Sequence, residues 1–138
     1  MSNKPTIVLV HGFWGGAAHW SKVITRLDKK GYASIFAVEN PLTSIADDAE
    51  RTRKMIAQQK GPVLLVGHSY GGAVITEAGN QPNVVGLVYI AAFAPDAGKA
   101  AAESPLRNLR LQRRILLLIV TDISGSDRTS FMRVFARI

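Results

Sequence analysis

The sequence predicts an α/β protein in which a parallel sheet carries helices on both faces. Between residues 6 and 90, four short apolar runs alternate with segments whose apolar residues recur at helical spacing. A strand–helix–strand series of this kind builds parallel strand pairs. The apolar runs also lack polar residues at alternate positions, which is typical of strands that are covered on both faces.

Each predicted strand is a run of apolar, mainly β-branched or aromatic residues, and the four are Thr6–Val10, 32–38, 63–66 and Val84–Ile90. Between the first two, apolar residues at helical spacing predict a helix over 17–30 that Gly31 ends. A short helix over 72–78 is expected after a glycine-rich turn.

The helix before the third strand has a recognisable beginning. Thr43 or Ser44 can cap it, and Asp47, Asp48 and Glu50 lie in its first turns, where the positive end of the helix dipole favours acids. Gly61 and Pro62 are expected to end this helix. Farther along, residues 106–120 fit either an amphipathic helix or a helix that runs into a strand at 115–120, and residues 131–138 fit a terminal helix.

Composition indicates one globular domain of 138 residues, with 47% hydrophobic and 20% charged residues. The absence of cysteine excludes disulfides and thiolate metal sites, and it fits a reducing compartment. No apolar run approaches the ~20 residues of a spanning helix, and the N-terminal run is too short for a signal peptide. We therefore expect a cytoplasmic protein without a membrane or metal partner.

The net charge of +7 is concentrated near the C-terminus. Residues 1–98 hold nine Lys and Arg against seven acids, whereas residues 99–138 hold eight against three, and seven of those eight are Arg. An Arg-rich tail could bind nucleic acid, with an affinity that falls steeply with salt. Because the chain has no recognised nucleic-acid module, nucleic acid is the weaker choice of partner, and a solvated face is the simpler interpretation.

The stretch VLLVGHSYGG at residues 63–72 carries the main chemical signal. A serine nucleophile at the tip of a strand needs a sharp turn into a helix, with small residues two positions to either side. Gly67 and Gly71 occupy those positions around Ser69. The alternative is a glycine-rich turn without chemistry. A dinucleotide or phosphate loop is disfavoured because neither G-x-G-x-x-G nor a Gly-Lys-Ser/Thr sequence is present.

A serine nucleophile also needs two backbone N–H groups to stabilise the oxyanion of the tetrahedral intermediate. One is expected from Tyr70, the residue after the serine. The second is expected from Phe13, in the HGFWGG loop after the first strand. That loop could equally be a glycine-rich connection to a helix.

Together, the segments at residues 11–20 (HGFWGGAAHW), 40–43 (NPLT) and 67–72 (GHSYGG) resemble the α/β-hydrolase fold family. Within it they are similar to the branch of small esterases and hydroxynitrile-lyase-like enzymes, over about residues 6–98. The resemblance implies cofactor-free hydrolysis of a small apolar ester, with Ser69 as nucleophile, Phe13 and Tyr70 as oxyanion donors and Trp14 near the substrate. It implies a structural role for His11, and an acid and then a histidine after the nucleophile.

The expected histidine is missing, because His11, His19 and His68 all precede Ser69. A neighbour on a tight turn points away from the serine, which excludes His68, and His19 fits a packed or solvated position. His11 is the only substitute base at a strand tip. Asp122 and Asp127 follow the serine, but surface positions explain them better, since an acid without a histidine has no role in a triad.

The expected function is therefore serine carboxylesterase-type hydrolysis, with activity reduced for want of the histidine. One alternative is a cofactor-free lyase on the same scaffold, because a fold does not determine its chemistry. A comparison of ester hydrolysis with cyanohydrin cleavage separates these two. The other alternative is a non-catalytic protein that binds a small molecule in the pocket.

We predict that residues 99–138 come from a shifted reading frame or a truncation. Near residue 99 the motifs of the family stop, and the basic residues change from mostly Lys to mostly Arg. The histidine expected after the serine is also missing from this part of the chain. Translation of the encoding DNA in the other two frames should give an apolar strand, an Asp-containing loop and a late His. If neither frame gives them, the hypothesis fails.

Overall fold

The computed structural model describes residues 4–92 and 118–119. Its sheet has the strand order β2-β1-β3-β4-β5, and the strands are β1 (Thr6–Val10), β2 (Ile35–Val38), β3 (Val63–His68), β4 (Val84–Ile90) and β5 (Leu118–Ile119). Strands β1 to β4 run parallel to their neighbours. The predicted parallel α/β architecture is confirmed.

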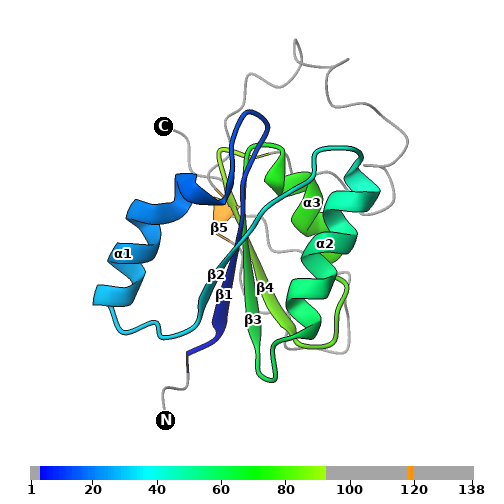
Figure 1. Ribbon diagram of the computed structural model, residues 1–138. Coiled ribbons are helices and arrows are strands. Elements are labelled where there is room, and N and C mark those ends of the chain that lie inside the picture. The colour runs from blue at the N-terminus through cyan, green and yellow to red at the C-terminus, as the bar shows by residue number, and fades with distance from the viewer. Residues whose placement is uncertain (1–3, 93–117, 120–138) are drawn as a thin grey trace.

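Helices cover both faces of the sheet, as predicted (Figure 1). One face carries the 3-10 helix η1 (Ala17–Trp20), which continues directly into α1 (Ser21–Lys29). The other carries α2 (Ile45–Ala57) and α3 (Gly71–Ala78). The loops that follow β1, β2 and β3 lie at one edge of the sheet, the upper edge in Figure 1.

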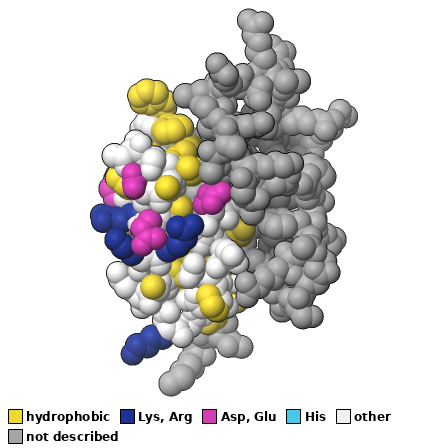
Figure 2. Space-filling model, turned by 90° about the vertical axis from the view of Figure 1, so that its right-hand side faces the viewer, with side chains coloured by type: hydrophobic (Ala, Val, Ile, Leu, Met, Phe, Trp, Pro, Cys, Tyr) yellow, Lys and Arg dark blue, Asp and Glu magenta, His cyan; other side chains and the backbone are white. Residues whose placement is uncertain are grey.

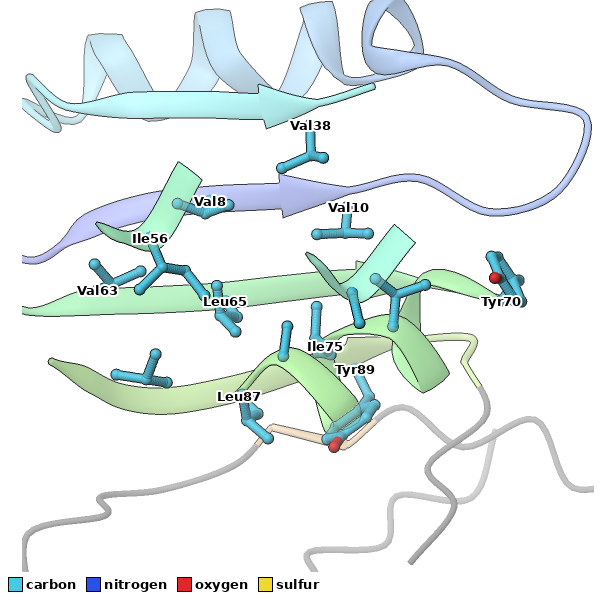
Figure 3. Close-up of a cluster of buried hydrophobic side chains, with 14 residues drawn as sticks. Val8, Val10, Val38, Ile56, Val63, Leu65, Tyr70, Ile75, Leu87 and Tyr89 are labelled. Atoms are coloured by element: carbon cyan, nitrogen blue, oxygen red, sulfur yellow. The ribbon is translucent and has the colours of Figure 1, made fainter. Parts of the chain in front are cut away.

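The core is split by the sheet into two layers, because successive side chains of a strand point to opposite faces. Val8 and Val10 of β1 pack with α2 and α3, in the larger cluster shown in Figure 3. Ile7 and Leu9 point the other way and pack with Trp20. Burial on both faces explains why these strands are continuously apolar in sequence.

Several element boundaries differ from the sequence prediction. The second strand begins at Ile35 rather than at residue 32, because the Tyr32 amide donates to Leu27 O and so completes the end of α1. The third strand continues to His68, two residues beyond its predicted end at 66. The helix after it begins at Gly71 rather than at residue 72.

The short strand β5 lies within the segment 115–120 that one interpretation of the sequence assigned to a strand. It pairs antiparallel with β4, with Ile119 opposite Val88 and Leu118 opposite Tyr89. The remaining residues of the segment 106–120, and the expected helix at 131–138, lie outside the described part of the chain.

Ser44 is the N-cap of α2. Its backbone is extended and its hydroxyl accepts a 3.0 Å hydrogen bond from the Asp47 amide. The hydroxyls of Thr43 and Ser44 both donate to the Asp47 carboxylate, and these bonds hold the pKa of Asp47 below its ordinary value. Of the two predicted caps, Ser44 therefore accepts a hydrogen bond from a backbone amide of the helix, whereas Thr43 bonds only to the Asp47 carboxylate.

We predict that Ser44→Ala lowers the free energy of unfolding by about 1 kcal/mol, because an amide in the first turn of α2 loses its acceptor. Urea unfolding followed by circular dichroism measures the change. Thr43→Ala is the matched control, since it removes a hydroxyl that contacts the same carboxylate and leaves the backbone bonds intact. Equal losses in the two variants would contradict the assignment of the cap.

Candidate active site

Ser69 lies in a strained turn between β3 and α3. Its φ angle is 52°, in the left-handed region that a residue with a side chain rarely adopts. The Ser69 amide donates to Ile90 O of β4 at 3.2 Å, and the Gly72 amide donates to Ser69 O at 3.0 Å. The surrounding structure thus holds the serine in a conformation that is typical of a nucleophile at a strand-to-helix turn.

Gly67 and Gly71 permit this turn because no side chain fits at either position. A Cβ on Gly67 would lie 2.5 Å from Gly71 O, and one on Gly71 would overlap Val10 O at the end of β1. The requirement for small residues two positions from the serine is therefore steric. Strand β3, the turn and β1 pack backbone to backbone here.

The loop after β1 reaches the serine. A Cβ on Gly12 would lie 2.9 Å from Ser69 Cβ and 3.5 Å from Ser69 Oγ, so the Gly12 backbone is a direct neighbour of the serine side chain. The next residue, Phe13, stacks its ring on that of Tyr70 with 4.0 Å between centroids and 23° between planes. The structure thus brings together the two residues from which the sequence predicts the oxyanion amides.

Backbone strain gathers at this edge of the sheet. Each parallel strand is followed by a non-glycine residue with positive φ: Trp14 after β1, Leu42 after β2, Ser69 after β3 and Ala91 after β4. Strained residues tend to cluster at functional sites, and ligands of parallel α/β sheets bind at the carboxyl ends of the strands. The edge therefore has the character of a binding site.

Large apolar side chains are exposed at the same edge. Trp14 is 98% exposed and Phe13 42%, and Leu42 adds a third apolar group from the loop after β2. Figure 2 shows hydrophobic side chains at the upper end of the described surface, whereas basic and acidic side chains intermix lower down. Trp14, predicted to lie near the substrate, is thus in the loop next to the serine with its ring in solvent.

Tyr70 is buried and tied to α2. Its hydroxyl donates to Asp48 Oδ2 at 2.6 Å, while Asp48 Oδ1 accepts from the Leu42 amide at 2.8 Å. Burial, and then the Asp48 carboxylate, raise the pKa of Tyr70 far above its ordinary value of 10.0. The Tyr70 hydroxyl is therefore a fixed donor and not an acid–base group at neutral pH.

Sequence reasoning missed Asp48, because its place in the first turn of a helix, beside Asp47, is enough to explain an acid there. A usable signal was present, since Asp48 shares the inward face of α2 with Ala49, Thr52 and Ile56. An acid on the apolar stripe of a helix needs buried hydrogen-bond donors. The pattern does not say which donors those are.

The three histidines do not serve the serine. His11 is buried, its Nδ1 donates to Gly12 O at 2.7 Å, and its Nε2 accepts from the Asn40 amide at 3.0 Å. Both ring nitrogens are therefore used in joining the loops after β1 and β2. His19 is exposed in η1, and His68 is exposed with its ring edge-on to Trp20.

Within residues 4–92 and 118–119, no histidine hydrogen-bonds the Ser69 hydroxyl. The structural role expected for His11 agrees with its contacts, and its use as a substitute base does not. Asp122 and Asp127 lie outside the described residues.

Comparison with known proteins supports the fold. The model of the alpha/beta hydrolase family matches residues 7–137. The chain belongs to the alpha/beta hydrolase family. A pyrethroid hydrolase from Sphingobium faniae has a similar structure, with a TM-score of 0.57 at 27% identity over 64% of this chain and 40% of that one.

Two curated relatives carry the name of a hydrolase or esterase. The alpha/beta hydrolase nvfD of Aspergillus novofumigatus is 32% identical over 70% of this chain and 46% of its own length. The carbendazim hydrolyzing esterase of Nocardioides sp. is 31% identical over 66% of this chain and 43% of its own length. This hydrolase-family chain thus spans less than half the length of the curated relatives it matches.

None of the helices within residues 4–92 and 118–119 has the length and apolar character needed to span a membrane. In the same residues, no three His, Cys, Asp or Glu side chains lie close enough together to hold a metal ion.

We predict that Tyr70 ionises only well above pH 10, because its phenolate would be buried beside a carboxylate. The unfolded chain releases this proton near pH 10 and the folded chain retains it, so the contribution to stability is present below pH ~10 and is lost as pH rises further. Absorbance at 295 nm should show a high-pH component that Tyr70→Phe reduces and does not abolish, because burial also raises the pKa of Tyr89. If the variant instead loses amplitude near pH 10, the hydroxyl is not held as described.

Proposed function

We propose that this protein is a serine carboxylesterase that hydrolyses a small apolar ester. The observation that carries the proposal is the strained Ser69 at the turn after β3, with the backbone of Gly12 directly beside it. A partly exposed serine at such a turn, faced by a second glycine-rich loop, has the arrangement that acyl transfer requires.

In the proposed reaction, Ser69 Oγ attacks the ester carbonyl and its proton passes to a base. The amides of Phe13 and Tyr70 stabilise the resulting oxyanion, and Tyr70 is favourably placed because it precedes the N-terminus of α3. Collapse of the intermediate expels the alcohol and leaves an acyl-Ser69 ester. Water then hydrolyses that ester and restores the serine hydroxyl. No metal or cofactor is required.

The apolar character proposed for the substrate rests on the exposed rings of Phe13 and Trp14, in the loop whose Gly12 lies beside the serine. Relatives named carbendazim hydrolyzing esterase and methylesterase 7 support an ester as the substrate class. A cytoplasmic location is part of the proposal, and a sequence without cysteine fits such a reducing compartment. A small-molecule ester, rather than nucleic acid or a membrane, is the proposed partner.

The described residues do not include an identified general base for the Ser69 proton. His11 uses both ring nitrogens, and none of the histidines contacts Ser69 within the described residues. Loss of a triad member lowers the rate by ~10⁴–10⁶, with residual catalysis from the oxyanion hole. This observation favours a second candidate, a non-catalytic protein that binds an ester at the same site without turnover.

We predict that a fluorophosphonate probe labels Ser69 and that Ser69→Ala abolishes the labelling. The reason is that the probe reacts only with a serine hydroxyl activated by its surroundings. Intact-protein mass spectrometry measures the adduct, and peptide mapping locates it. Ser34→Ala is the matched control, because Ser34 is exposed and lies on the connection before β2.

Turnover is measured separately, with p-nitrophenyl acetate for esterase activity and mandelonitrile for lyase activity. Labelling together with ester hydrolysis supports the esterase. Labelling with cyanohydrin cleavage alone would replace it with a lyase. A protein that binds p-nitrophenyl acetate but neither labels nor turns over would establish the non-catalytic candidate.

A further inference from the structure

Asp48 is a fully buried acid whose partners are neutral. It is 0% exposed on the inward face of α2. Within the described residues, its carboxylate has no Lys, Arg or His at ion-pair distance. Burial of a carboxylate is costly unless hydrogen bonds replace its water. Both of its oxygens are used: Oδ2 accepts from the Tyr70 hydroxyl at 2.6 Å and Oδ1 from the Leu42 amide at 2.8 Å.

These two donors belong to two different loops at the edge of the sheet that holds Ser69. Leu42 follows β2 and has a φ of 59°, so the bond to Asp48 helps to hold a strained backbone. Tyr70 follows Ser69 directly and is the residue before α3. One carboxylate on α2 therefore fastens the loop after β2 to the nucleophile turn.

The Tyr70 ring extends this connection to a third loop. Its face lies against the Phe13 ring, in the loop after β1, with 4.0 Å between centroids. Asp48 holds the hydroxyl end of Tyr70 and Phe13 covers the ring, so Tyr70 has little freedom to rotate. The series Asp48–Tyr70–Phe13 thus includes both residues whose amides are the proposed oxyanion donors.

We propose that Asp48 is a positioning residue that sets the oxyanion hole by fixing the Tyr70 side chain between α2 and Phe13. This inference rests on the proposed function. Asp48 does not touch the substrate. Its bond to Tyr70 limits the movement of the Tyr70 backbone, and through the stacked rings that of Phe13. Preorganised amides matter because donors that reorient during the reaction lose much of their stabilisation of the oxyanion.

The chain offers a matched control in Tyr89. Tyr89 is also buried, and its hydroxyl shares a 2.8 Å hydrogen bond with the Thr76 hydroxyl. It belongs to the same core cluster as Tyr70, but it lies on β4 and its hydroxyl bonds to α3 rather than to a loop of the site. Tyr89→Phe and Tyr70→Phe each remove one buried tyrosine hydroxyl.

The first measurement is hydrogen exchange of the Phe13 and Tyr70 backbone amides, followed by NMR in the full chain. We expect Tyr70→Phe to speed exchange of both amides about tenfold, the equivalent of one buried hydrogen bond, and Tyr89→Phe to leave them unchanged. Urea unfolding of both variants corrects for global stability. Equal exchange in the two variants would overturn the inference, whatever the activity of the protein.

Asp48→Asn tests the carboxylate itself. The Asn side-chain oxygen can still accept from the Leu42 amide. Its NH₂ group then replaces the oxygen that accepts from the Tyr70 hydroxyl, and it can only donate to that hydroxyl. We expect the Tyr70 amide to exchange faster than in the parent and more slowly than in Asp48→Ala. If Asp48→Ala does not fold, the comparison of Tyr70→Phe with Tyr89→Phe still decides.

The second measurement is the rate at which the fluorophosphonate labels Ser69. It should fall about tenfold in Tyr70→Phe and in Asp48→Asn, and stay the same in Tyr89→Phe, since one oxyanion donor alone can change rates by ~10²–10³. Slowed labelling with unchanged exchange would contradict positioning. A parent protein that never labels would contradict the proposed function, and the exchange measurement would still decide the role of Asp48.

Discussion

The register of β1 against β3 is the constraint on which the site depends. Val10, the last residue of β1, pairs with Gly67, so the two parallel strands leave the sheet at the same level. Two residues farther along each strand, Gly12 and Ser69 are neighbours. The close approach of Gly71 to Val10 O permits this register, because any larger residue would separate the strands. Side-chain size in a single turn therefore controls the distance between two loops.

In the loops next to Gly12 and Ser69, hydrogen bonds from buried side chains hold the backbone in strained conformations. His11 joins the loops after β1 and β2 through Gly12 O and the Asn40 amide. Asp48, on α2, joins the loop after β2 to the turn after β3, through the Leu42 amide and the Tyr70 hydroxyl. Positive-φ residues cost of order 1–3 kcal/mol each unless their surroundings fix them. These polar contacts are thus better understood as supports of strained loops than as general sources of stability.

Much of the fold could be predicted because it depends on local patterns. The strands β1 and β4 have their predicted limits, and the apolar spacing of α1 and the Ser44 cap of α2 were visible in sequence. The errors lie at boundaries where a tertiary contact decides, such as the Tyr32 amide that closes α1 and delays β2. Asp48 was misjudged for the same reason, since an acid in a first turn has a sufficient local explanation.

The sequence by itself determined the parallel architecture, the position of Ser69 and the need for glycine at 67 and 71, because these follow from periodicity and from sterics within a few residues. Only the tertiary structure decided that Gly12 lies against Ser69, that His11 is fully engaged and that Asp48 holds Tyr70. Those contacts join residues far apart in the chain. Their partners are selected by strand register and helix packing, which no local pattern encodes.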